Sequence, residues 1–221
     1  MNLERYEYKR SWTFKEYDFY SIGPKGRIRK VVRFRTMTSQ GAPCYNLSFG
    51  DWNSRNEKLD DSTVTNNGDT EKVLATVAAI VVNFTTFFPE AMVYAEGLNA
   101  ARTRRYQMGI SKLLNEIQKT FNVYGRIDKS WKPFRKNENY NAFLVTRKQL
   151  ITLEEETDYY MKSALEKNDN KKIHYNDIVD VEMETFDNDP FFIKKDEMAR
   201  KSIEKYGLPE ELMKQYRDKE S

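Results

Sequence analysis

Residues 69–89 contain the feature that most constrains how this chain can fold. Asp69 stands in the N-cap position of a predicted helix, and Pro89 ends it. Between them, apolar residues recur with helical spacing and cover nearly all faces of the helix: Val73, Leu74, Val77, Ile80, Val81, Phe84, Phe87 and Phe88. Because a helix that is apolar all round must be covered by other elements, this segment is expected to lie buried against a sheet.

The flanking segments place that helix inside a βαβα unit. The alternating run 45–49 precedes the helix, and the short apolar run 91–95 follows it. After Gly97 and Asn99, a second amphipathic helix of about six turns is expected from Ala101 to Phe121. A further strand, apolar on both faces, is expected at 141–146.

The N-terminal segment predicts an antiparallel hairpin that turns at residues 23–26. Together with the βαβα unit, it defines an α+β fold with a mixed sheet. Because strand side chains alternate, the return arm places four arginines on one face: Arg27, Arg29, Arg33 and Arg35. They would form a stripe that binds phosphates, or they would pair with Glu16 and Asp18 of the neighbouring strand.

Charge divides the chain into two parts. Residues 1–150 carry 25 Lys and Arg against 15 Asp and Glu, whereas residues 151–221 carry 12 against 19. We therefore expect a basic α+β body, 1–150, and an acidic, mainly helical C-terminal extension, 151–221. Helices are expected at 154–165, at 195–206 and after Pro209, with a linker at 168–172. Either the extension folds over a positive face of the body, or each part binds a different partner.

The densest polar cluster lies in the first turns of the second helix. It contains Arg102, Arg104, Arg105 and Tyr106. Because cations near a helix N-terminus oppose the helix dipole, they predict either an acidic partner from the protein itself or a bound anion. Arg102 and Tyr106, four residues apart, share one helix face and are the candidate catalytic residues.

Other chemistries find little support in the sequence. Cys44 and His174 are the only residues of their types, so a multi-cysteine zinc site is excluded and a Cys/His pair is disfavoured. The carboxylates Asp51, Asp60, Asp61 and Asp69 lack a metal-binding spacing, and no metal site is predicted. The segment 66–70 is expected to be a self-capped helix start rather than a nucleotide cradle, because Asp69 occupies the place of an anion.

The N-terminus lacks an apolar signal core, and the longest apolar run, 77–82, is too short to span a membrane. A cytoplasmic protein without a membrane partner is expected.

Four segments carry a resemblance to a known family. They are Tyr20 to Gly26, Tyr45 to Asp51, Asn67 to Val77 and Ala101 to Tyr106. Over about residues 12–147 the chain resembles an uncharacterised family found mainly in Bacteroidetes and their relatives. The resemblance implies a bacterial origin and no particular activity.

A second resemblance is architectural. The helix, strand and second helix, with Asn99 and Tyr106 seven residues apart and Gly109 following, are similar to the end of a GCN5-related acetyltransferase. In that superfamily an Asn begins the last helix and a Tyr acts as general acid, so the resemblance implies this role for Tyr106. The superfamily also has a basic, glycine-rich pyrophosphate loop before the preceding helix, which residues 66–70 do not reproduce. The resemblance therefore extends more readily to the fold than to coenzyme A binding.

Three functional hypotheses follow. The first is a bacterial protein that binds nucleic acid or another polyanion through Arg27, Arg29, Arg33, Arg35, Arg102, Arg104 and Arg105, as part of a defence or toxin–antitoxin system. The second is an acetyltransferase-like enzyme that uses Tyr106. The third is a non-catalytic interaction protein whose Arg102 to Arg105 segment docks the acidic extension or a second subunit, including a second copy of the chain. The sequence identifies no cofactor.

Overall fold

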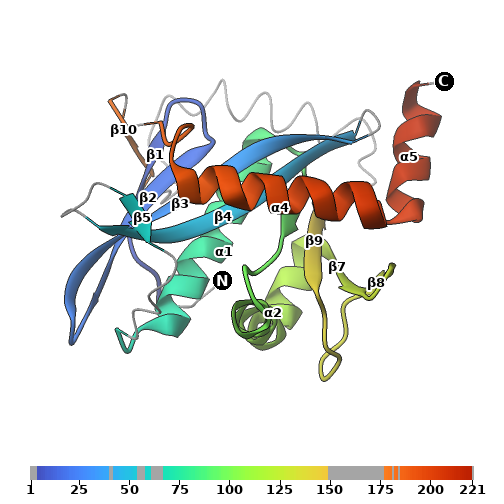
Figure 1. Ribbon diagram of the computed structural model, residues 1–221. Coiled ribbons are helices and arrows are strands. Elements are labelled where there is room, and N and C mark those ends of the chain that lie inside the picture. The colour runs from blue at the N-terminus through green and yellow to red at the C-terminus, as the bar shows by residue number, and fades with distance from the viewer. Residues whose placement is uncertain are drawn as a thin grey trace, which may run out of the picture.

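The computed structural model describes residues 4–39, 42–53, 58–60, 67–148, 177–180, 182–183 and 185–220 of the 221-residue chain. The described part contains one mixed sheet and four helices (Figure 1). The strands are β1 (Tyr8–Ser11), β2 (Glu16–Gly23), β3 (Gly26–Ser39), β4 (Ala42–Asn53), β5 (Lys58–Asp60), β6 (Met92–Ala95), β7 (Phe121–Ile127), β8 (Ser130–Pro133), β9 (Ala142–Arg147) and β10 (Asp177–Asp180). The helices are α1 (Thr70–Phe87), α2 (Ala100–Thr120), α4 (Pro190–Tyr206) and α5 (Glu210–Glu220). The predicted α+β class is confirmed.

The strands lie in the order β10-β1-β2-β3-β4-β6-β9-β7-β8, and β5 pairs with β4 beside this path. Strands β1 to β4 are antiparallel neighbours, and β4 and β6 are parallel. The connection between β4 and β6 contains α1, and α2 follows β6. The predicted βαβα unit is therefore present, joined to the predicted N-terminal hairpin.

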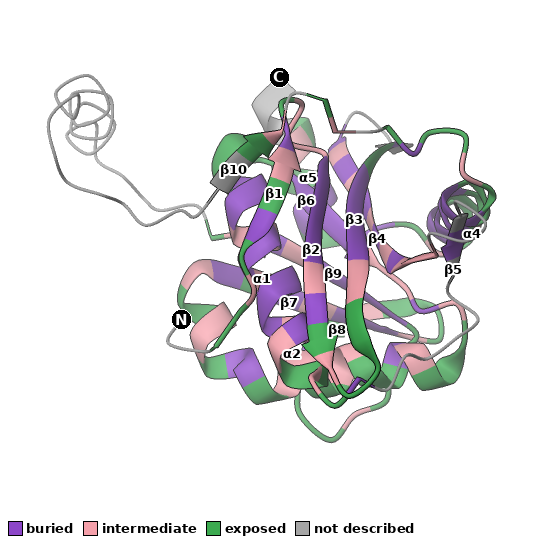
Figure 2. Cartoon of the chain, turned by 90° about the vertical axis from the view of Figure 1, so that its left-hand side faces the viewer, coloured by how far each residue is buried: buried purple, intermediate pink, exposed green. Residues whose placement is uncertain are grey.

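The hairpin between β2 and β3 turns where the sequence predicts. Gly23 lies opposite Gly26, and Gly26 has a φ of +88°, a conformation that glycine adopts without strain. The tip is exposed, whereas the middle of both strands is buried (Figure 2).

Helices cover both faces of the sheet (Figure 1). Alternate residues of β3, such as Val32 and Phe34, pack against Ile80 and Phe84 of α1 on one face. On the opposite face, Val31 packs against Phe192 of α4. Side chains of α4 and α5 also share a cluster with β4 and β6, which includes Cys44, Met92, Ile203, Leu212 and Met213. The described part of the C-terminal extension thus contributes to the core of the body, and the division at residue 150 stays a prediction.

Some elements differ from those expected. Helix α4 begins at Pro190, five residues before the predicted start, because Asp189 caps it by accepting a hydrogen bond from the backbone N–H of Phe191 at 2.9 Å. Strands β1, β5, β7 and β8 were not predicted. Gly125 lies within β7, where the ring of Tyr140 packs so closely that a Cβ would lie 2.2 Å from it. The helix predicted at 154–165 and the linker at 168–172 lie outside the described residues.

Helix α1 is the one described helix that is long and apolar enough to cross a membrane by length and composition. Its mean hydropathy is 1.2, and half of it is buried within the protein. Core helices of soluble proteins meet the same criteria, so this helix is weak evidence for a membrane span.

Candidate functional site

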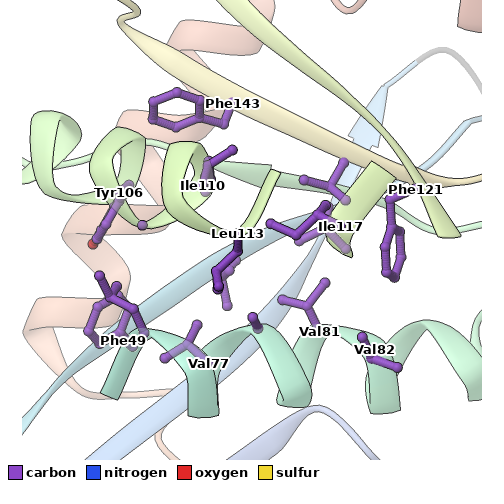
Figure 3. Close-up of a pocket in the computed structure, with 17 residues that line it drawn as sticks. Phe49, Val77, Val81, Val82, Tyr106, Ile110, Leu113, Ile117, Phe121 and Phe143 are labelled. Carbon is purple, nitrogen blue, oxygen red and sulfur yellow. The ribbon is translucent and has the colours of Figure 1, made fainter. Parts of the chain in front are cut away.

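A cavity of about 120 Å³ lies between α1, α2 and the sheet (Figure 3). Its lining is formed by Leu47, Phe49, Leu74, Val77, Ala78, Val81, Val82, Val93, Ala95, Tyr106, Gly109, Ile110, Leu113, Ile117, Phe121, Phe143 and Val145. Among these described residues, the hydroxyl of Tyr106 is the only polar side-chain group. The amphipathic spacing of α2 directs Tyr106, Ile110, Leu113 and Ile117 toward this cavity.

One end of the cavity is marked by two aromatic rings. The ring centroids of Phe49 and Tyr106 lie 5.5 Å apart. Phe121 and Val82 lie at the other end, near the C-terminal ends of the two helices (Figure 3). The candidate catalytic tyrosine is thus placed at one end of an otherwise apolar space.

The cavity lies over an interruption in the sheet. Strand β4 pairs with β6 only over Cys44–Asn46 and with β5 only over Asp51–Asn53. In the described part of the chain, residues 47–50 of β4 have a strand partner on the β3 side alone. Leu47 and Phe49 from this segment and Ala95 from the end of β6 line the cavity, so the gap between the strands opens onto it.

A second concavity adjoins the first at the start of α1. Its volume is about 140 Å³, and it is lined by Thr70, Glu71, Leu74, Arg105, Met108, Gly109, Lys112 and Leu113. Both spaces share Leu74, Gly109 and Leu113. Gly109 permits the helices to approach here, because a Cβ at this position would lie 2.9 Å from Cδ1 of Leu74. Arg105 and Lys112 therefore place positive charge in the concavity next to the apolar cavity.

The structure does not bring the predicted arginines onto one face. Arg102, Arg104 and Arg105 lie on α2, whereas the arginines of β3 lie on the sheet face that α4 covers. Within that stripe, Arg33 is only 2% exposed. Its guanidinium donates to the Asp196 carboxylate at 2.6 Å and to the Phe186 carbonyl at 2.7 Å. Its contacts are therefore within the protein.

The other arginines of β3 also have partners within the protein. Arg35 forms an ion pair with Asp187, and Arg29 lies 2.6 Å from Asp18 of β2. The guanidinium of Arg27 stacks on the ring of Tyr20, with 3.7 Å between its Cζ and the ring centroid. The predicted pairing of this stripe with Asp18 is present. Glu16 instead accepts hydrogen bonds from Ser11 and Thr13.

The described part of the acidic extension lies against the arginine stripe of β3, one of the positive faces that the sequence offered. Its Asp187 and Asp196 contact arginines of β3, not the predicted Arg102 to Arg105 segment. Asp196 also accepts a hydrogen bond from Nδ2 of Asn46 at 2.9 Å. Burial raises the pKa of Asp196 against the opposing effects of Asn46 and Arg33, and burial also lowers the pKa of Arg33. Desolvation of this pair is therefore the dominant effect on both groups.

Arg126 and Glu96 form a second buried polar cluster that sequence reasoning missed. Arg126 is 3% exposed and donates to the hydroxyl of Ser202 in α4 at 2.6 Å. The carboxylate of Glu96 lies 3.5 Å from Arg126 and accepts a hydrogen bond from Tyr94. The hydroxyl oxygens of Tyr94 and Ser202 lie 3.0 Å apart. No sequence signal identifies these residues, because their proximity depends on how α4 lies across the sheet.

The residues considered for other chemistries are dispersed. Cys44 lies in β4. It is fully buried, and burial raises the pKa of its thiol to about 12. His174 and Asp61 lie outside the described residues. Asp51 pairs with Lys30, and within the described ranges no three His, Cys, Asp or Glu side chains are grouped to hold a metal ion.

The predicted self-cap of α1 is wrong. Asp69 precedes the helix, but its side chain makes no capping hydrogen bond. Its carboxylate instead accepts hydrogen bonds from the hydroxyls of Ser21 in β2 at 2.6 Å and of Tyr6, which precedes β1, at 2.8 Å. By contrast, Asn99 does cap α2 by accepting a hydrogen bond from the backbone N–H of Arg102 at 3.0 Å.

These features define an α+β protein with a mixed sheet, in which a β4-α1-β6-α2 unit surrounds an apolar cavity. The chain belongs to a family of unknown function, DUF6934, whose sequence model matches residues 2–148. No curated protein and no solved structure matches the chain. The predicted membership of an uncharacterised family is confirmed. The distribution in Bacteroidetes and the similarity to GCN5-related acetyltransferases stay predictions.

Proposed function

We propose that the protein is an acyltransferase-like enzyme that takes an acyl thioester of coenzyme A, with Tyr106 as the general acid. The observation that carries this proposal is the gap between the parallel strands β4 and β6, which opens onto an apolar cavity whose single polar side-chain group is the Tyr106 hydroxyl. The Asn99 cap of α2 agrees with the resemblance to the GCN5-related enzymes.

The gap suits a ligand that resembles an extended peptide. Backbone N–H and C=O groups require hydrogen-bond partners, and a strand edge without a neighbour can obtain them from an added extended chain. The pantetheine arm of coenzyme A carries amide groups that can supply such partners along residues 47–50 of β4. Its thioester end would then lie beside Leu47, Phe49 and Tyr106.

Tyr106 would act when the thioester breaks. The nitrogen of an acceptor amine attacks the thioester carbonyl carbon, a C–N bond forms, and the C–S bond breaks with its electron pair leaving on sulfur. The phenol proton of Tyr106 passes to that sulfur, which gives the free thiol, and the proton released from the amine nitrogen restores the phenol through solvent. A positioned general acid contributes about 10²–10⁴-fold to such a step.

Positive charge for the phosphates of coenzyme A would come from α2. The basic loop expected before α1 is missing, but Arg105 and Lys112 line the concavity at Thr70, where α1 begins. Arginine and lysine both bind phosphate, and the start of a helix favours an anion.

The first test is binding and turnover. An excess of coenzyme A or acetyl-coenzyme A, at 100 times its dissociation constant, is expected to stabilise the full-length protein by about 2.7 kcal/mol, measured by thermal unfolding. Tyr106→Phe is expected to lower thiol release with a panel of amine acceptors by about 10²–10⁴-fold while leaving ligand binding unchanged. Tyr20→Phe, remote from the cavity, is the matched control. Absence of any stabilisation by either compound would refute the proposal.

Polyanion binding remains a second candidate because Arg104 and Arg105 are exposed and have no ion pair with a described residue. On this proposal α2, rather than the β3 stripe, contacts nucleic acid phosphates. A role in a defence or toxin–antitoxin system would be its cellular setting.

A salt series tests this second candidate. Binding of short RNA and DNA duplexes and single strands is expected to weaken steeply between about 50 and 200 mM salt, because neutralised phosphates release counterions. Substituting both Arg104 and Arg105 by alanine should reduce the affinity and the salt slope, whereas Arg217→Ala in α5 should leave both unchanged. Absence of binding at the lowest salt concentration would eliminate the candidate.

A further inference from the structure

The apolar cavity extends well beyond the space that an acetyl group needs. Its lining follows α1 from Leu74 to Val82, a length of about 12 Å at 1.5 Å per residue. Phe49 and Tyr106 lie at one end, and Val82 and Phe121 lie at the other (Figure 3). A ligand that reaches Tyr106 therefore leaves most of this length unfilled unless it carries a longer chain.

The chemistry of the lining selects an apolar occupant. Beyond Tyr106, the side chains that surround the cavity are aliphatic or aromatic and offer no hydrogen-bond donor or acceptor. A volume of about 120 Å³ would hold several waters, but each ordered water needs two to four polar partners. The deep part of the cavity therefore favours hydrocarbon over water.

The adjoining concavity contains positive charge, which indicates that the occupant carries an anionic head group. Arg105 and Lys112 lie in the adjoining concavity, which shares Gly109 with the apolar cavity. Lys112 forms an ion pair with Glu71, whereas no described acid forms an ion pair with Arg105. The shared residues lie nearer to Tyr106 than to Phe121 along α2, so the cationic side adjoins the tyrosine end.

We infer that the cavity binds an unbranched acyl chain longer than acetyl, whose anionic head group lies at Arg105 and Lys112. This inference rests on the proposed function in its choice of acyl-coenzyme A as the principal source of the chain. A free fatty acid offers the same two chemical features and is the alternative source. In either case, Tyr106 stands where the chain joins its head group.

A chain-length series tests the inference on the full-length protein. Dissociation constants are measured by calorimetry for coenzyme A and for its acetyl, butanoyl, hexanoyl, octanoyl and decanoyl thioesters, and for the corresponding free acids. Each buried methylene contributes about 0.8 kcal/mol, so affinity is expected to rise about fourfold per methylene until the cavity is filled. Beyond that length, the affinity should level off or fall.

Two matched variants locate the chain. Ala78 lines the cavity between Leu74 and Val82, and a leucine there would occupy the space of the deeper methylenes. Ala78→Leu is expected to remove the gain for octanoyl and decanoyl ligands while sparing acetyl, whereas Ala101→Leu at an exposed position of α2 should change nothing. Circular dichroism and thermal unfolding confirm that both variants fold.

The outcomes separate the inference from the proposed function. If all thioesters bind with equal affinity, the chain-length inference is overturned and the proposed function stands. If fatty acids bind with the expected chain-length dependence while coenzyme A and its esters do not bind, the cavity assignment stands and the acyltransferase proposal fails. If Ala78→Leu leaves the chain-length dependence unchanged, the chain lies elsewhere and the inference fails.

Discussion

A fragment that ends at residue 150 is expected to lose the native fold of the body. It lacks β10, α4 and α5, and with them the apolar side chains that complete two core clusters: Phe186, Phe191, Phe192, Ala199, Ile203, Leu208, Leu212 and Met213. Burial of a large apolar side chain contributes about 1.5–3 kcal/mol, whereas a whole domain is stable by only about 5–15 kcal/mol. The combined loss of burial free energy therefore exceeds the stability of a typical domain.

The single cysteine reports on this loss directly. In the full-length protein Cys44 is fully buried, and its thiol has a pKa of about 12, so a thiol reagent at neutral pH should leave it unmodified. In the 1–150 fragment the side chains from α5 are missing, and we expect rapid modification, a lower melting temperature or none, and aggregation.

A control in trans separates lost contacts from other effects of truncation. Co-expression of residues 177–221 with the fragment is expected to restore solubility and protect Cys44, because a partner that binds only the folded body stabilises it by mass action. A 1–150 fragment that melts like the full chain and keeps Cys44 unreactive would show that the extension is dispensable.

Local sequence patterns predicted the elements that position the cavity. The apolar run that ends at Pro89, the alternating run 45–49 and the spacing from Ala101 to Phe121 led correctly to α1, β4 and α2. These patterns are reliable because each element must bury one face or all faces, whatever its partners are. Strand β7 was not predicted. Its Gly125 accommodates the ring of Tyr140, a contact that the local sequence does not indicate.

The charged residues were harder to place, for a physical reason. Alternation correctly put Arg27, Arg29, Arg33 and Arg35 on one face of β3, but it could not show that α4 covers that face. The contact between Arg33 and Asp196 spans 163 positions, and nothing in the local sequence of either residue indicates the other. Similarly, Tyr106 was selected from its spacing to Arg102 and from a resemblance, and its apolar surroundings depend on residues from six elements.

The ion pair between Arg33 and Asp196 is expected to be the most sensitive polar contact in the molecule. The two groups lie 2.6 Å apart, with side-chain exposures of 2% and 12%. Removing one partner leaves the other charge buried and uncompensated, which costs about 3–5 kcal/mol in comparable pairs. Arg33→Met and Asp196→Leu should therefore each lower the free energy of unfolding by about that amount, measured by urea denaturation.

The double variant measures how much of this loss comes from leaving one charge buried without its partner. Burial opposes ionisation of both groups, so the cost of desolvating the two charges offsets most of their mutual attraction. Removing both charges together therefore costs less than removing either one alone. Arg33→Met combined with Asp196→Leu is therefore expected to regain about 2 kcal/mol relative to the sum of the single variants. It will not recover fully, because the Phe186 carbonyl and the Asn46 amide each lose a partner.

The neighbouring pair supplies the matched control. Arg35 and Asp187 also join β3 to the extension, but their side chains are 47% and 53% exposed. An exposed pair is worth about 1 kcal/mol or less, so Arg35→Met should have a small effect and weaken further in high salt. If Arg33→Met costs no more than Arg35→Met, the buried pair does not hold α4. In that case the apolar contacts of Phe191, Phe192 and Ile203 alone would place the extension on the sheet.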